Sequence, residues 1–231
     1  MKVITFLIVA VFFCAPVNAQ SFYSISAGVN TGEIVTEING KKDDAIKGAI
    51  GYTVKTNIYI PVAKSLLVQC GVEYETVSNK VNTDYSNTVG GTTIKETFTG
   101  KSFLGYIQIP LRLTYSLPAG KGRFFAGAGP YAGIGVGGRS KSTEIIETTL
   151  GPNTTRSEYN YNKKVSFGDA DTSIKRINMG LGLNLSYATV GNLLFSLYAN
   201  KGLNNINNRT NYNTKTWSAG ITVGYLFKNR E

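Results

Sequence analysis

The chain has 231 residues and a formal net charge of +10, with 24 basic residues, 14 acidic residues and no histidine. The absence of histidine excludes Ser-His and Cys-His catalytic pairs and histidine metal ligands. The excess basic residues are scattered at the ends of predicted elements and form no stripe with interleaved aromatic residues, so we expect no nucleic-acid partner.

The N-terminal segment has the three parts of a secretory signal peptide. Lys2 provides a basic start, residues 3–14 are apolar, and Val17-Asn18-Ala19 offers small residues for cleavage. We therefore predict a signal peptide over residues 1–19 and a mature domain over residues 20–231, beginning at Gln20. A lipoprotein signal is disfavoured because Phe13, a large residue, precedes Cys14. After cleavage Cys70 is the only cysteine, so an intramolecular disulfide is impossible.

Apolar and polar residues alternate with a period of two in eight segments of the mature chain, which predicts β-strands. In the clearest segment, every second residue from Ile107 to Leu117 is apolar, whereas the residues between them include Gln108 and Arg112. The predicted strands, in chain order, are Tyr23–Asn30, Ile50–Val62, Leu66–Glu75, Gly105–Leu117, Phe124–Val136, Ile177–Tyr187, Leu193–Asn200 and Trp217–Phe227.

The connections between these strands alternate in length. Three are short, at Ala63–Ser65, Pro118–Gly122 and Thr189–Asn192, and four are long and polar, at Thr31–Lys47, Ser78–Lys101, Arg139–Thr172 and Gly202–Lys215. An even number of strands with short turns at one end and long loops at the other is typical of outer membrane barrels. We therefore predict an all-β protein, an eight-stranded antiparallel up-and-down transmembrane β-barrel. Hairpin tips at residues 89–92 and 151–153 would let strands continue above the membrane.

Aromatic residues on the outward face of the predicted strands fall into two belts, as expected for the two membrane interfaces. The turn-end belt comprises Tyr23, Tyr115, Phe124, Tyr187, Phe195, Tyr225 and Phe227, and the loop-end belt comprises Tyr52, Tyr74 and Trp217. The eight residues from Trp217 to Tyr225 would span roughly 20 Å at a strand tilt near 40°, close to the apolar thickness of such barrels. A soluble sandwich would show no such spacing.

The inward face carries charged, tyrosine and glycine residues. We predict a structural charge layer in the barrel lumen made by Lys55, Glu73, Glu75 and Arg112. The lumenal tyrosines Tyr59, Tyr131 and Tyr198 would fill the space that inward glycines leave. An eight-stranded barrel is only wide enough for its own side chains, so a filled interior is favoured and a solute pathway is the alternative.

Several motifs resemble those of the PorT-type outer membrane β-barrel proteins of Bacteroidetes. They are the strand Tyr106-Ile107-Gln108-Ile109-Pro110-Leu111, the following strand Ala126-Gly127-Ala128-Gly129-Pro130-Tyr131, the segment Gly180-Leu181-Gly182 and the closing segment Gly224-Tyr225-Leu226-Phe227. The resemblance implies an eight-stranded barrel similar in plan to OmpA/OmpX-type barrels and supplies no catalytic residues. A few members of the family serve a secretion system.

The sequence therefore predicts a non-enzymatic, monomeric protein of the bacterial outer membrane with no catalytic, cofactor or metal site. Its function would lie in the outer loops, and its expected partners are outer membrane lipid and envelope or secretion-system proteins. The alternatives are a narrow, porin-like channel or transporter for small solutes and an accessory component of a secretion or envelope machine. The asparagine-rich run at residues 204–208 predicts a flexible loop.

Overall fold

The computed structural model describes residues 21–228, apart from 43–44 and 172. The predicted signal peptide lies outside these residues. The described chain forms ten strands: β1 (Phe22–Ile38), β2 (Lys41–Lys42), β3 (Ile46–Ala63), β4 (Leu66–Val89), β5 (Thr92–Ala119), β6 (Gly122–Leu150), β7 (Asn153–Lys164), β8 (Ile177–Ala188), β9 (Leu193–Gly202) and β10 (Tyr212–Lys228). Within these residues no helix has the length and apolar character needed to cross a membrane.

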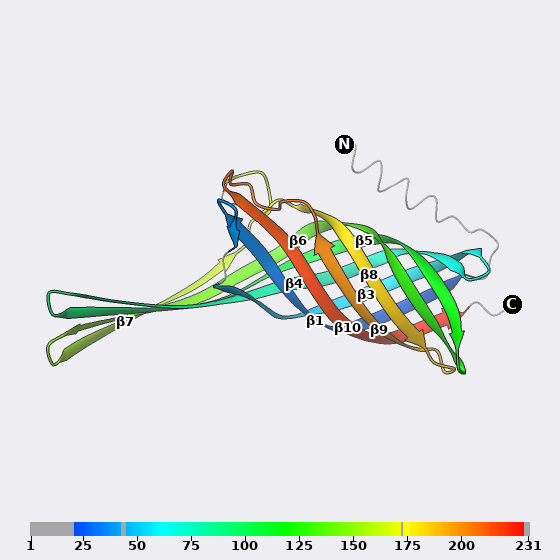
Figure 1. The fold of residues 1–231 in the computed structure, drawn as a ribbon, viewed down its shortest axis with the longest axis horizontal. Helices are drawn as coiled ribbons and strands as arrows, with labels where there is room; N and C mark the ends of the chain where they lie inside the picture. Colours follow the sequence, from blue (N-terminus) through cyan, green and yellow to red (C-terminus); the bar gives the residue numbers. More distant parts are fainter. Residues whose placement is uncertain (1–20, 43–44, 172, 229–231) are drawn as a thin grey trace.

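Eight of the strands close into a barrel (Figure 1). The order around the barrel is β1, β3, β4, β5, β6, β8, β9 and β10, each strand antiparallel to the next. Pairing of β1 with β10 over the full length of both strands, from Phe22 opposite Lys228 to Ile38 opposite Tyr212, completes the ring. The prediction of an eight-stranded antiparallel up-and-down barrel is confirmed. The other two strands, β2 and β7, pair with β1 and β6 respectively.

The barrel has the reverse polarity of a water-soluble protein. Along β8, exposed apolar residues such as Leu181 and Leu183 alternate with buried polar residues such as Asn184 and Ser186. The same alternation runs along the parts of β1 and β3 that belong to the barrel wall. Because the exposed face is apolar around the wall, the surrounding medium that suits it is lipid.

The short connections match their predicted positions. They are two-residue turns at Lys64–Ser65 and Gly120–Lys121 and a four-residue turn at Thr189–Asn192. Gly120 and Asn192 adopt the left-handed backbone conformation, with φ of 59° and 62°. Glycine and asparagine are the residues that tolerate this conformation at a tight turn.

Three of the connections predicted to be long loops are mostly strand. The first, Thr31–Lys47, contains the end of β1, all of β2 and the start of β3. The other two are longer. Ser78–Lys101 contains the outer halves of β4 and β5, and Arg139–Thr172 contains the outer half of β6 and all of β7. These segments form a four-stranded ribbon that projects far beyond the barrel mouth (Figure 1). The predicted hairpin tips are confirmed: Gly90 and Gly91 turn the first hairpin with φ of 60° and 80°, and Gly151 with φ of 58° turns the second.

Alternation fails as a strand signal in the ribbon for a physical reason. A barrel wall has one face toward lipid and one toward the interior, so its residues alternate strongly. In the ribbon the alternation is weaker, because acidic residues such as Glu96 and Glu144 share a face with Ile94 and Phe98. The ribbon instead contains many threonines, which favour strands because a β-branched side chain packs well on a pleated surface.

The lipid-facing wall gives a direct stability prediction. Leu183 lies near the middle of β8 and is 59% exposed. Leu183→Arg should lower the free energy of unfolding by about 2–4 kcal/mol, because it places a charge near the bilayer midplane. Urea unfolding in phosphatidylcholine vesicles measures this cost. Tyr85→Arg, at a 61% exposed position on the ribbon, is the control and should change stability by less than about 0.5 kcal/mol. Equal effects would contradict the membrane placement.

Candidate functional site

The structure brings three of the four predicted charge-layer residues into one buried ion-pair cluster. The Arg112 guanidinium donates two hydrogen bonds to the Glu73 carboxylate, with N–O distances of 2.6 and 3.0 Å. Lys55 Nζ lies 3.5 Å from Glu73 Oε2. All three side chains are almost completely buried. The cluster forms because the register places Lys55 of β3 directly opposite Glu73 of β4, while Arg112 reaches it from β5.

The fourth residue, Glu75, is bound by neutral donors. Its carboxylate accepts hydrogen bonds from Tyr198 and Asn200 at 3.0 Å each, and from Gln108 and Asn30 at 3.0 and 3.2 Å. These donors come from β9, β5 and β1, so Glu75 of β4 connects strands across the lumen. A carboxylate with several donors is stable when buried, whereas an unpaired one would be costly. The two carboxylates and two cations of the layer leave the interior without net formal charge.

The three lumenal tyrosines occupy different levels of the interior. Tyr198 lies beneath Lys55, whose Nζ is 3.1 Å from the ring centroid, a cation–π contact. Tyr131 extends toward Gly180 on β8, where a Cβ would lie 2.7 Å from the tyrosine hydroxyl. Tyr59 packs near the turn end against Phe125, with ring centroids 5.5 Å apart. Together they occupy the space around the charge layer.

Glycine makes room for the buried arginine. A Cβ on Gly182 of β8 would lie 3.2 Å from one terminal nitrogen of Arg112 and 2.7 Å from the side chain of Asn200. A larger residue at this position would therefore press on the Asn200 side chain and on the guanidinium, and both would have to shift. Gly182 belongs to the Gly-Leu-Gly motif of the sequence, and its role is to admit a large side chain from β5, which is separated from β8 only by β6.

Both ends of the lumen are occupied by apolar clusters. At the turn end, the buried cluster contains Tyr59, Leu67, Phe125, Ala188, Leu194 and Leu226, with Phe22 packed against it. At the mouth, a second cluster contains Ile34, Val77, Leu104, Tyr106 and Ile206, with Val165, Phe167 and Ile174 packed against it. The polar layer therefore lies between two apolar layers, a division that the sequence did not reveal.

The asparagine-rich run is an ordered cover over the mouth, so the expectation of a flexible loop was wrong. Ile206, in its centre, is fully buried in the mouth cluster. The Asn208 side-chain amide donates to the backbone carbonyls of Gly168, Ala170 and Ser173, at 2.8 to 3.0 Å. These bonds attach the β9–β10 connection to the β7–β8 connection. Asparagine side chains can bond to backbone groups of irregular segments, and these bonds hold the connection in place.

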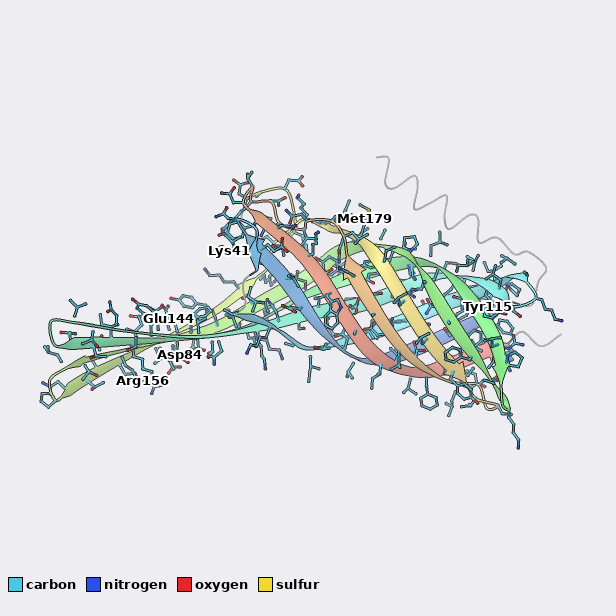
Figure 2. The ribbon with its side chains drawn as sticks, in the orientation of Figure 1. Lys41, Asp84, Tyr115, Glu144, Arg156 and Met179 are labelled. Carbon is cyan, nitrogen blue, oxygen red and sulfur yellow. The ribbon has the colours of Figure 1, made fainter. Side chains whose placement is uncertain are left out.

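The predicted interface aromatics lie on the outer surface of the barrel. Tyr23, Tyr52, Tyr115, Tyr187, Trp217, Tyr225 and Phe227 are all exposed. Tyr74 is half-buried beside Tyr52, with ring centroids 5.7 Å apart. Figure 2 shows Tyr115 at the end of the barrel far from the ribbon, which is its predicted level.

The ribbon has two chemically different faces, which follow from its register. One face, here called the aromatic face, carries Tyr85, Ile94, Phe98, Ile146, Tyr159 and Tyr161. The other, here called the threonine face, carries a row of four directly opposite threonines, Thr88, Thr93, Thr149 and Thr154. Hydroxyl contacts of 3.0 Å join the first two and the last two of this row. Figure 2 shows Asp84, Glu144 and Arg156 along the projecting part.

The sequence comparison agrees with this architecture. Residues 18–208 match the family described as outer membrane protein β-barrel domain. The chain belongs to this family. It is therefore an outer membrane β-barrel protein. Among the described residues of this barrel, no group of three or more Cys, Asp or Glu side chains could hold a metal ion.

Solved barrels of low sequence identity are similar to the chain. They include Ail, the attachment invasion locus protein of Yersinia pestis (13% identity, 90% of this chain and 99% of Ail covered, TM-score 0.36). Neisserial surface protein A (14%, 89% and 97%, TM-score 0.35) and OprG of Pseudomonas aeruginosa (13%, 91% and 97%, TM-score 0.38) are others. Likeness of this degree says nothing about activity or ligand. No protein of curated function matches the sequence.

The buried cluster makes a testable prediction. Glu73→Leu would leave Arg112 and Lys55 buried without their carboxylate, so the free energy of unfolding should fall by about 3–5 kcal/mol. Equilibrium unfolding in urea, followed by tryptophan fluorescence in lipid vesicles, gives the value. Glu147→Leu is the matched control, because Glu147 forms a solvent-exposed ion pair with Arg156 at 3.7 Å and should cost less than about 1 kcal/mol. If both variants unfold like the unaltered barrel, the cluster does not stabilise it.

Proposed function

We propose that this barrel is a non-enzymatic, monomeric interaction protein whose ribbon presents a recognition surface outside the outer membrane. The observation that carries the proposal is the aromatic face. Tyr85, Tyr159 and Tyr161 are between 41% and 61% exposed there, and Ile94 is 44% exposed. A sheet normally buries its apolar face against another layer. The described residues provide no second layer for this face, so a partner protein in the envelope is the natural cover.

The chemistry of the aromatic face suits protein recognition. Tyrosine provides a large contact area with few rotatable bonds and a hydroxyl that can bond a polar partner. The ribbon also has two strand edges without a neighbour among the described residues, Asn82–Val89 of β4 and the outer side of β7. Unpaired edges can receive an extended segment of a partner through backbone hydrogen bonds.

The filled interior supports this role over that of a channel. A solute would have to cross two apolar clusters and displace an ion-pair cluster whose members are all buried. A role as an accessory component of a secretion or envelope machine is a form of the same proposal. It draws support from the motifs shared with PorT-type barrels of Bacteroidetes, some of which serve secretion, and it would make the ribbon the contact to that machine.

Photo-crosslinking in live cells tests the proposal. The crosslinking amino acid p-benzoylphenylalanine is placed at Tyr85 or Tyr159 on the aromatic face, and at Thr97 on the threonine face as the matched control. We expect discrete protein adducts from the aromatic face, at least severalfold stronger than from Thr97. Heat-modifiable mobility on gels checks that each variant is folded and inserted.

Two results would contradict the proposed role. The first is equal, diffuse labelling from all three positions, which would indicate random collision and no recognition surface. The second is a steady single-channel conductance of the purified barrel in planar bilayers that Arg112→Gln alters, which would instead support the channel. A ribbon-trimmed barrel that lacks residues 82–99 and 143–160 should fold normally. Crosslinkers at the positions that remain at the base of the ribbon should then give no protein adducts.

A further inference from the structure

The register of the sheet aligns lysines of neighbouring strands at the base of the ribbon. Lys80 of β4 lies directly opposite Lys101 of β5, and Lys101 lies directly opposite Lys141 of β6. On its other side Lys80 is opposite Lys47 of β3. All four residues are exposed. We call Lys80, Lys101 and Lys141, with Lys47 at its end, the lysine row.

This arrangement is unfavourable for the protein alone. Directly opposite residues in an antiparallel sheet have Cβ atoms about 4.5–5.5 Å apart and project from the same face, so like charges there repel. Among the described residues, none of the four lysines has an acidic partner within ion-pair distance. On the threonine face, the next acidic residue of β4 is Asp84, four positions from Lys80. The next acidic residue of β7 is Glu158, four positions from Asn162, the residue opposite Lys141. Glu158 already lies near Arg156, at 3.9 Å.

A second pair of cations reinforces the row. Arg139 of β6 is directly opposite Lys164 of β7, and both are exposed. Arg139 also lies opposite Phe103 of β5, which is two positions from Lys101. The two rows therefore share one face, and six cationic side chains gather within two residues along the strands. An anionic ligand would compensate this density of positive charge.

The rows lie where the lipid-facing wall ends. The last exposed apolar side chains on this side of the barrel include Ile50 on β3, Phe103 on β5 and Val136 on β6. The cations follow two or three residues later on each strand, at Lys47, Lys101 and Arg139. That separation corresponds to about 7–10 Å along a tilted strand. It places the cations in the headgroup region, next to the hydrocarbon that the apolar side chains contact.

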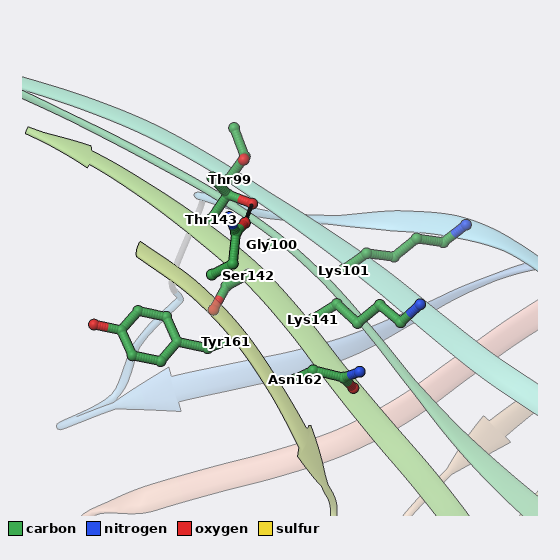
Figure 3. Close-up of a pocket in the computed structure, with 9 residues that line it drawn as sticks. Thr99, Gly100, Lys101, Lys141, Ser142, Thr143, Tyr161 and Asn162 are labelled. Atoms are coloured by element: carbon green, nitrogen blue, oxygen red, sulfur yellow. Dashed lines mark hydrogen bonds between the residues drawn. The ribbon is translucent and has the colours of Figure 1, made fainter. Parts of the chain in front are cut away.

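Figure 3 shows how the side chains at this place are directed. Lys101 and Lys141 extend side by side in the same direction, with Asn162 on the next strand, whereas Tyr161 projects from the opposite side of the sheet. A shallow hollow of about 470 Å³ lies at this level. Its lining includes Lys101, Lys141 and Asn162 from the side of the lysine row, and Gly100, Ser142 and Tyr161 from the side of the aromatic face. The hollow thus combines ammonium groups with hydroxyl and amide groups, the donors that bind phosphate oxygens.

We propose that the lysine row binds the phosphate groups of phosphorylated glycolipid in the outer leaflet. Lysine binds phosphate as a point charge, and neighbouring amines can share one phosphate or hold two on the same headgroup. The aligned spacing of the row, its position at the edge of the apolar wall and the absence of acidic partners among the described residues each fit a ligand that is anchored in the leaflet. Binding would fix the base of the ribbon on the membrane surface, independently of what the aromatic face recognises.

The experiment uses the folded mature barrel in neutral detergent and purified lipopolysaccharide whose lipid anchor carries its phosphates. The triple variant Lys80→Gln, Lys101→Gln, Lys141→Gln should bind roughly 100-fold more weakly, since each surface cation contributes about fivefold. Native mass spectrometry gives the bound fraction. The matched control, Lys95→Gln, Arg156→Gln, Lys163→Gln, removes the same charge elsewhere on the ribbon and should bind normally. A second control replaces the three lysines of the row by arginine, which keeps the charge, and should also bind normally.

Four comparisons decide the outcome. Enzymatic removal of the anchor phosphates should weaken binding of the unaltered barrel as much as the triple variant does. Equal binding by the triple variant and its matched control would overturn the proposal. So would competition by millimolar inorganic phosphate alone, which would mean a free-phosphate site. Tighter, row-dependent binding of soluble dextran sulfate would also overturn it, because the row would then serve a polyanionic glycan and not a membrane lipid.

Discussion

Hydrogen bonding of the backbone in lipid is the constraint on which this structure depends. A bilayer core offers no partner to a free N–H or C=O, so a sheet can cross it only if it has no edge. The pairing of β1 with β10, which brings the two ends of the described chain together, removes the edges. Closure then forces the inverted polarity of the wall, because one face of every strand must meet lipid. The apolar exterior of β8 and its polar interior follow from this requirement.

Closure with eight strands also decides what the interior can contain. The ring is too narrow for a water-filled passage and too polar on its inner face for a simple apolar core. The protein meets both conditions by neutralising its buried charges internally: Glu73 with Arg112 and Lys55, and Glu75 with neutral donors from three strands. Gly182 leaves the space into which the guanidinium fits. Apolar side chains occupy the two ends, so the interior is a packed support and the chemistry available for interaction lies outside.

Beyond the membrane the constraint is relaxed, and the ribbon shows the result. Its outer strands β4 and β7 have edges without a neighbour among the described residues, which would be prohibitive in lipid but is acceptable in water. The ribbon can therefore carry different chemistry on each face. Aromatic residues gather on one face, while threonines and the basal lysines occupy the other. A rigid barrel that holds such a ribbon upright is well suited to display a surface.

The sequence by itself determined the barrel, because a strand with lipid on one side and packed polar groups on the other must alternate with a period of two. It determined the strand order, the short turns and the inward direction of Glu73 and Arg112 in the same way. Tertiary structure decided what depends on pairing between distant segments. The length of the ribbon, the burial of Ile206 over the mouth and the alignment of Lys80, Lys101 and Lys141 all required the register. These lysines are separated by about 20 and 40 positions along the chain and become direct neighbours only when the strands pair. No local sequence pattern indicates which residues of distant strands will lie opposite each other.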